Sequence, residues 1–210
     1  MDDHEARQEF SRLIAVTIGT IIAAIVLIFA VVTFFRSSYS FNYRAERSGN
    51  IPDYSALSQT RRDILAVTEQ EFNNPGDMLR YSDGVKEPWC ADFVSWVYLE
   101  ANHPFENPNS GSWRIPGTYT LQEYFKANNR WHAYDDELPQ PGDVVIYRNG
   151  IFGDHANIVV ASDYNEILTI GGNENGKIMM HRITYSDARY GIVGYGLAEA
   201  ESTESDTSTD

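Results

Sequence analysis

The longest apolar run of the chain lies near its N-terminus. Residues 13–35 contain no Asp, Glu, Lys or Arg and consist mainly of Ile, Val, Ala, Leu and Phe. A helix of that length crosses the hydrocarbon core of a bilayer, which is about 30 Å thick. The run is too long for the apolar part of a signal peptide, and no small-residue cleavage site follows it. The pattern therefore predicts one transmembrane helix over 13–35, preceded by a short tail at 1–12.

The stretch at 36–57 is polar and predicts a linker that leads away from the membrane. Helical periodicity begins after it, at 59–72, where Ser58 or Thr60 is a candidate cap. A further short helix is expected around 121–128, because its apolar residues recur on one side.

Beyond residue 140 the spacing of apolar positions changes from helical to strand-like. Short, β-branched runs separated by turn residues lie at 143–147, 156–161, 167–170, 178–183 and 192–195. Their order predicts an antiparallel sheet of about five strands. Helices followed by such a sheet indicate an α+β domain, which we place at 58–197. The acidic, Ser/Thr-rich end at 198–210 is predicted to be disordered.

The chain has a formal net charge of −14 at pH 7 and a single cysteine. Such an acidic protein is a poor ligand for nucleic acid or for anionic lipid headgroups, so neither is expected as a partner. One cysteine excludes an internal disulfide and a zinc site built from several cysteines.

That cysteine opens an apolar helix. Cys90, Val94, Val97 and Ala101 recur at helical spacing, and turn residues precede them. The first turn of a helix collects unpaired amides and the positive end of the helix dipole, and both favour a thiolate. Cys90 is therefore either a nucleophile or a small buried apolar residue, and the second role is common for cysteine.

Among the five histidines, His155 has the most informative position. It directly precedes an apolar run, so it lies where a strand begins, and catalytic groups often protrude at strand ends. If the runs at 156–161 and 167–170 form a hairpin, His155 falls opposite Gly172 and beside Asn173. The amide of Asn173 then reaches the imidazole and fixes its tautomer. Taken alone, His155 is equally well explained as a loop residue and Asn173 as a turn residue.

Four motifs follow one another along the domain. They are Trp-Cys-Ala-Asp-Phe-Val at 89–94, Pro-Gly-Asp-Val-Val at 141–145, His-Ala-Asn-Ile-Val-Val at 155–160 and Thr-Ile-Gly-Gly-Asn at 169–173. Together they resemble the CHAP family of cysteine, histidine-dependent amidohydrolases and peptidases, over about residues 58–197. The resemblance implies a papain-like α+β fold related to NlpC-type peptidases. It also implies cleavage of an amide bond in peptidoglycan, with Cys90 as nucleophile, His155 as base and Asn173 as orienting amide.

The chain departs from the family pattern at Gly171, where many members have a Glu. Either Asn173 then orients the histidine alone, or activity is reduced. Some members bind calcium near the cysteine, and Asp83 and Asp92 match those ligands in part. Both are also explained without a metal, as a turn residue and as a helix-start residue near the dipole's positive end. No cofactor is predicted to be required, and calcium stays open as an alternative.

Two further residues are candidates for substrate contacts. The oxyanion of the reaction is expected to meet the backbone N–H of Cys90 and a second donor, for which Tyr81 is a candidate. Trp113 lies in a loop rich in Pro, Gly, Ser and Asn, and it either lines the groove or anchors the loop.

The predicted function is a membrane-anchored peptidoglycan hydrolase, either an endopeptidase or an N-acetylmuramoyl-L-alanine amidase. Its partners are the peptide part of peptidoglycan and the membrane, through residues 13–35. The distribution of arginines leans weakly towards a cytoplasmic C-terminal side. Peptidoglycan lies outside the cell, however, so we expect a single-pass protein of the cell membrane with an extracytoplasmic catalytic domain. The alternatives are a catalytically weak or inactive CHAP-fold protein that binds the wall or assists assembly, and a cytosolic amidase.

Overall fold

The structure is a computed structural model. It describes residues 12, 14, 16–29, 43–46, 53–134, 137–148, 153–185 and 191–200. The chain divides into two compact units, Met1–Ser40 and Phe41–Asp210, which are described separately.

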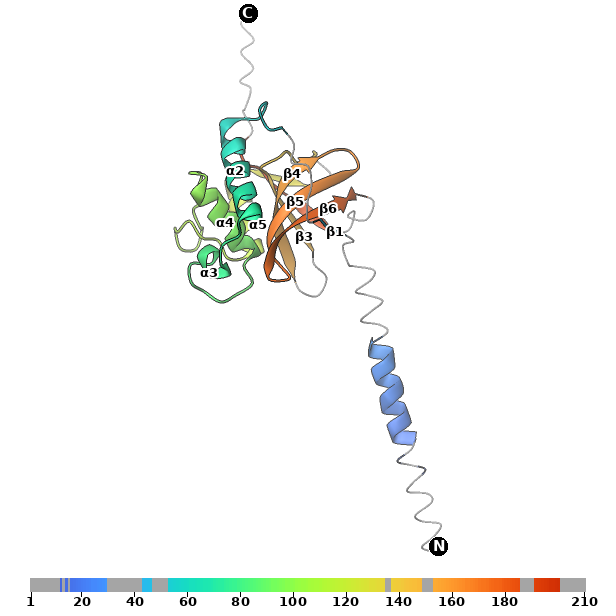
Figure 1. Cartoon of the computed structure of the whole chain (residues 1–210). Helices are drawn as coiled ribbons and strands as arrows, with labels where there is room; N and C mark the ends of the chain where they lie inside the picture. Colours follow the sequence, from blue (N-terminus) through green and yellow to red (C-terminus); the bar gives the residue numbers. More distant parts are fainter. Residues whose placement is uncertain are drawn as a thin grey trace, which may run out of the picture. The chain divides into compact units, whose positions relative to one another are not determined.

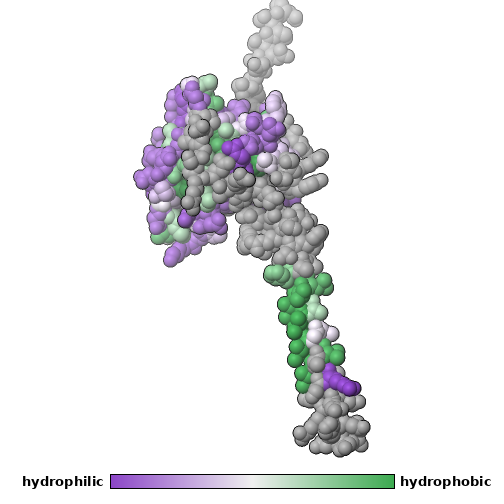
Figure 2. Space-filling model, turned by 45° about the vertical axis from the view of Figure 1, so that its right-hand side comes forward, coloured by the Kyte–Doolittle hydropathy of each residue, from purple (hydrophilic) through white to green (hydrophobic). Residues whose placement is uncertain are grey.

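In the first unit, residues 16–29 are helical and exposed, and their surface is largely hydrophobic (Figure 2). Residues 13, 15 and 30–35 of the predicted membrane span lie outside the described residues. So do the tail before residue 12, most of the predicted linker at 36–57, and 201–210 at the acidic end. Within the described parts of the chain, no helix is both long enough and apolar enough to cross a membrane.

The second unit is an α+β domain built on one antiparallel sheet. Its strands, as far as the structure describes them, lie in the order β1-β6-β5-β4-β3-β7-β2. They are β1 (Tyr43–Glu46), β2 (Trp131–Ala133), β3 (Val144–Arg148), β4 (Asp154–Ser162), β5 (Glu166–Glu174), β6 (Lys177–Thr184) and β7 (Ile192–Gly196). The five predicted strands are confirmed as β3 to β7. The two strands that were not predicted, β1 and β2, are short and form the two edges of the sheet.

Four helices are described in this unit, and they lie together on one face of the sheet (Figure 1). They are α2 (Gln59–Asn73), α3 (Met78–Tyr81), α4 (Cys90–Glu100) and α5 (Thr118–Ala127). Ser58 caps α2, since its hydroxyl accepts a hydrogen bond from the backbone N–H of Arg61. The central helix is α4, which packs against β4 and β5 and is buried from Cys90 to Tyr98.

Alternation along the strands produces two apolar clusters. The larger one joins the helices to the sheet and includes Phe93 and Val97 of α4 with Ile158 and Ile170 of the sheet. A smaller cluster, formed by Val145, Tyr147, Val159, Ile167, Ile183, Ile192 and Tyr195, collects the alternate positions of the strands. The sheet is therefore buried on both sides, which holds the strand ends near α4 in fixed positions.

The Pro-Gly-Asp motif ties the domain together around a buried carboxylate. Asp143 is 1% exposed, pairs with the Arg61 guanidinium at 2.9 Å, and accepts hydrogen bonds from the backbone N–H groups of Gln140 and Ala198, both at 2.8 Å. Gly142, with φ 95°, accepts a hydrogen bond from the Tyr98 hydroxyl of α4. This motif thus links α2, α4 and the end of the domain, and its role is structural.

Replacing Asp143 with Asn keeps its size and removes the charge that pairs with Arg61. We expect the free energy of unfolding of Asp143→Asn to fall by about 3 kcal/mol, because a buried guanidinium loses its counter-charge. Urea unfolding followed by tryptophan fluorescence measures this loss. Asp83→Asn is the matched control, since Asp83 is exposed and has φ 53°, which Asn tolerates. Equal stability of the two variants would contradict the role given to Asp143.

Candidate active site

Cys90 is the first residue of α4, as predicted, and it is 7% exposed. The backbone N–H groups of Ala91 and Ala156 hydrogen-bond to its sulfur. The sulfur therefore sits among the unpaired amides of a helix start and beside the backbone of β4, where a thiolate is well solvated by the protein.

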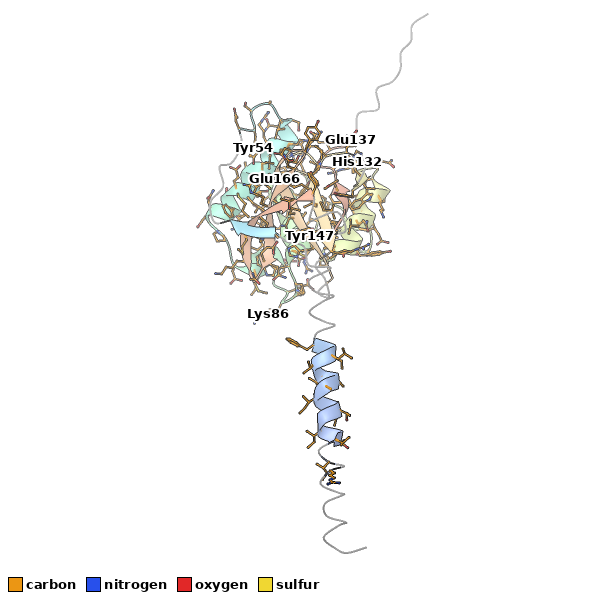
Figure 3. All side chains as sticks on the ribbon, turned by 90° about the vertical axis from the view of Figure 1, so that its right-hand side faces the viewer. Tyr54, Lys86, His132, Glu137, Tyr147 and Glu166 are labelled. Carbon is orange, nitrogen blue, oxygen red and sulfur yellow. The ribbon has the colours of Figure 1, made fainter. Side chains whose placement is uncertain are left out.

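His155 lies at the beginning of β4 and hydrogen-bonds to Cys90. Its Nε2 is 3.1 Å from the Oε1 atom of Glu174, which leaves Nδ1 for the thiol. The Tyr147 ring packs against the imidazole, with ring centroids 5.3 Å apart (Tyr147 is labelled in Figure 3). The imidazole is thus in contact at both nitrogens and on one face.

The predicted hairpin between β4 and β5 is present, with a register one residue from the prediction. Ile158 pairs with Ile170, and continuing that register places His155 opposite Asn173. Within the described residues, however, no hydrogen bond joins the Asn173 side chain to the imidazole. The predicted orienting amide is therefore next to the histidine in the sheet but does not hold it.

A β-bulge at the end of β5 explains why Glu174, and not Asn173, contacts the His155 imidazole. The pairing of β5 with β6 shifts between Gly171 and Glu174, and Asn173 has a positive φ of 59°. An extra residue in a strand inverts the alternation of the side chains beyond it. Glu174 consequently lies on the side of Gly171, where a Cβ would be 1.9 Å from the Asn157 Oδ1 atom. Asn157 and His155 are two residues apart on β4 and share that side, so the bulge brings the carboxylate to the imidazole.

The turn after the bulge fixes Glu174 as the last residue of β5. Asn175 and Gly176 both have positive φ, 53° and 75°, and they join β5 to β6 as a two-residue turn. Asn-Gly is the preferred pair for such a turn. This pair is a signal in the sequence that could have identified Glu174 as a strand-end residue, although it does not indicate the bulge.

The Glu174 carboxylate is buried and shared among four side chains. Its Oε1 atom lies 3.1 Å from the Nε2 atoms of both His155 and His181. It also accepts hydrogen bonds of 3.2 Å from the Tyr147 hydroxyl and from the Asn157 amide. The donors come from β3, β4 and β6, so three strands position one oxygen. Of these four partners, the sequence indicates a role only for His155.

The charges of this cluster favour an ion pair between Cys90 and His155. Burial opposes the charged imidazole, but its contacts with Cys90 and Glu174 raise the pKa of His155 to about 10. Burial likewise opposes the thiolate, but the hydrogen bond and charge of His155 hold the pKa of Cys90 below its ordinary value. Burial opposes ionisation of Glu174 as well, but His155 and His181 hold its pKa far below the usual range. The stability that His155 gains is complete below its ordinary pKa and is lost as the pH rises through about 10.

Residues 80–173 match the model of the family described as CHAP domain. The chain carries a CHAP domain. The matched region includes Cys90 and His155 and ends at Asn173, so Glu174 and His181 lie just beyond it. A comparison with curated proteins finds no match.

The two substrate-contact candidates of the CHAP domain have different positions. Tyr81 is fully buried, stacks on Trp89, and donates its hydroxyl to Glu71 at 2.6 Å. It belongs to the core, where its hydroxyl is bound to Glu71, and its assignment as the second oxyanion donor stays a prediction. Trp113 is partly buried and packs against the larger core cluster, which agrees with its role as a loop anchor.

The two partial matches to calcium ligands, Asp83 and Asp92, lie in different surroundings. Asp92 is fully buried, and the Arg114 Nε atom lies 2.8 Å from its Oδ1 atom. Burial raises the pKa of Asp92 to about 7, and the guanidinium beside it favours the carboxylate. Arg114 also pairs with Glu87, while Asp83 is exposed in a turn. Among the described residues, no group of three or more His, Cys, Asp or Glu side chains could hold a metal ion. A guanidinium therefore balances the charge of Asp92.

Labelling of Cys90 by iodoacetamide distinguishes the predicted orienting residue from the observed one, because the reagent reacts with the thiolate. In the full chain we expect labelling to begin below the usual thiol pKa of about 8.5. Glu174→Gln removes the charge that stabilises the imidazolium, so its labelling midpoint should rise by about one pH unit. Asn173→Gly keeps the positive φ and should leave the midpoint unchanged. Equal shifts in the two variants would contradict the assignment of Glu174.

Arg114→Gln leaves the carboxylate of Asp92 buried without its counter-charge. We expect the free energy of unfolding to fall by about 3 kcal/mol, measured by circular dichroism in urea. Arg148→Gln is the control, because Arg148 is exposed at the end of β3.

The melting temperature of the wild-type chain should be the same in calcium and in EDTA. An increase on adding calcium would contradict the role given to Arg114.

Proposed function

We propose that this protein is a peptidoglycan hydrolase that cleaves an amide bond through a thioester on Cys90. CHAP domains are typically cysteine- and histidine-dependent amidohydrolases or peptidases, and their presence suggests a peptidoglycan substrate. The observation that carries the proposal is the series of contacts Cys90–His155–Glu174. It supplies a nucleophile, a proton carrier and an orienting carboxylate within direct contact.

The reaction proceeds in two half-reactions. The Cys90 thiolate attacks the amide carbonyl carbon, and the resulting oxyanion accepts a hydrogen bond from the backbone N–H of Cys90 at the helix start. His155 gives its proton to the leaving amine, the C–N bond breaks, and an acyl thioester remains on the sulfur. The now neutral His155 takes a proton from water, which attacks the thioester and releases the acid and the thiolate. Glu174 keeps the imidazole oriented throughout.

We propose that residues 13–35 anchor the hydrolase in the cell membrane. An acidic domain has no electrostatic attraction to an anionic wall, so a membrane anchor would supply the local concentration that charge does not. We infer a single-pass protein of the cell membrane, with the catalytic domain on the side where peptidoglycan lies.

The alternative, a wall-binding or assembly protein without catalysis, rested on Gly171. Two observations weaken it. The space that a side chain at 171 would occupy is filled by Asn157, and a carboxylate reaches His155 from Glu174 instead. The departure from the family pattern therefore leaves the histidine with an acidic partner.

Incubation of the purified full chain in detergent with isolated peptidoglycan tests the function. We expect wild-type protein to release soluble muropeptides, and Cys90→Ser to release at least about 1,000-fold fewer, because the hydroxyl is not ionised by the imidazole. Mass spectrometry of the fragments shows the bond: free peptides with an intact glycan indicate an amidase, and shortened cross-links indicate an endopeptidase. Equal release by both proteins would contradict catalysis by Cys90.

A further inference from the structure

His181 is buried beside the candidate site and has no role in the reaction described above. It lies on β6, which is flanked by β1 and β5 in the sheet, and it is 1% exposed. Its backbone pairs with Ala45 on one side and with Thr169 on the other. A buried side chain on an internal strand has a fixed position, which is what the support of a catalytic group requires.

Its contact is with the orienting carboxylate. The Nε2 atom of His181 is 3.1 Å from the Oε1 atom of Glu174, the same distance and the same oxygen as for His155. One carboxylate oxygen thus lies between two histidines, one from β4 and one from β6. We propose that His181 is a positioning residue, which holds Glu174 so that this carboxylate in turn holds the His155 imidazole.

Glu174 needs such a support because of its place in the fold. It is the last residue of β5, between a bulge and a two-residue turn, and its side chain has three rotatable bonds. Strand ends are the least constrained part of a hairpin. Tyr147 and Asn157 also donate to Oε1. They belong to β3 and β4, which lie on the same side of β5 in the sheet as His155. Only His181, among these four partners, comes from the strand beyond β5.

The role does not require His181 to change its protonation state. An imidazole with a proton on Nε2, 3.1 Å from the Glu174 Oε1 atom, can donate to this carboxylate in either protonation state. His181 contacts neither the thiol nor the substrate in this scheme, so its effect reaches the reaction only through Glu174. That condition makes the inference testable by a double-mutant cycle.

The test uses the full chain in detergent and three single variants. His181→Met removes the donor with little change in size, His181→Gln restores an N–H group at a similar reach, and His103→Gln is the control. His103 is a suitable control because it makes a surface ion pair with Asp63 at 3.6 Å. Each variant is measured by the pH profile of Cys90 labelling and by kcat and KM for muropeptide release. If His181→Met does not fold, His181→Asn replaces it, because its amide is too short to reach Glu174.

We expect His181→Met to lower kcat about tenfold with KM nearly unchanged, the loss typical of one hydrogen bond to a charged group. His181→Gln should recover most of that loss, and the control should match wild type. In a Glu174→Gln background, His181→Met should have no further effect on the labelling midpoint or on kcat. A further tenfold loss in that background, or a loss in His181→Gln equal to that in His181→Met, would overturn the proposal.

The inference rests on the proposed function, but the two can fail separately. The labelling profile reads the Cys90–His155 pair without any substrate. A shifted profile in His181→Met together with no muropeptide release by wild-type protein would reject the hydrolase and leave the positioning role supported. Release by wild-type protein with an unshifted profile and unchanged kcat in His181→Met would reject the positioning role alone.

Discussion

The contact between the Glu174 carboxylate and the His155 imidazole is the interaction on which the rest of the site depends. A buried carboxylate is costly unless its charge is compensated and its lone pairs are used. Here two histidines, a tyrosine hydroxyl and an amide meet one oxygen at 3.1–3.2 Å. The same contacts that offset the cost of burying Glu174 also favour the charged form of His155, and the imidazolium in turn favours the thiolate of Cys90. The burial of Glu174, the orientation of His155 and the ionisation of Cys90 therefore have one physical origin.

The backbone of β5 makes that contact available. Gly171 leaves space for Asn157, Asn173 adopts the positive φ of the bulge, and Asn175-Gly176 turns the chain into β6. Each of these residues is permissive where another side chain would strain the backbone or clash. The segment that departs from the family pattern is thus locally consistent, and it supplies an acidic partner from a different position in the chain.

The sequence predicted those features that depend on repeated patterns. Cys90 at a helix start, the five strands and the β4–β5 register, to within one residue, all follow from periodicity that extends over several residues. The bulge depends on the backbone angle of a single residue, and strict alternation predicts the wrong side for everything beyond it. The proximity of Tyr81 to Cys90 in the sequence does not reveal the aromatic cluster that buries its side chain. The Glu174–His181 contact joins two strands across a hairpin, and no local pattern indicates it. The membrane span at 13–35 stays a prediction.

The site depends on His155 being an imidazolium across the neutral pH range, because its contacts with Cys90 and Glu174 raise its pKa. The most direct measurement is the ¹⁵N chemical shift of both ring nitrogens of His155 in the full chain, followed from pH 5 to pH 11. We expect both nitrogens to stay protonated until the pH approaches about 10. Loss of the proton near the ordinary histidine pKa of about 6.5 would contradict it.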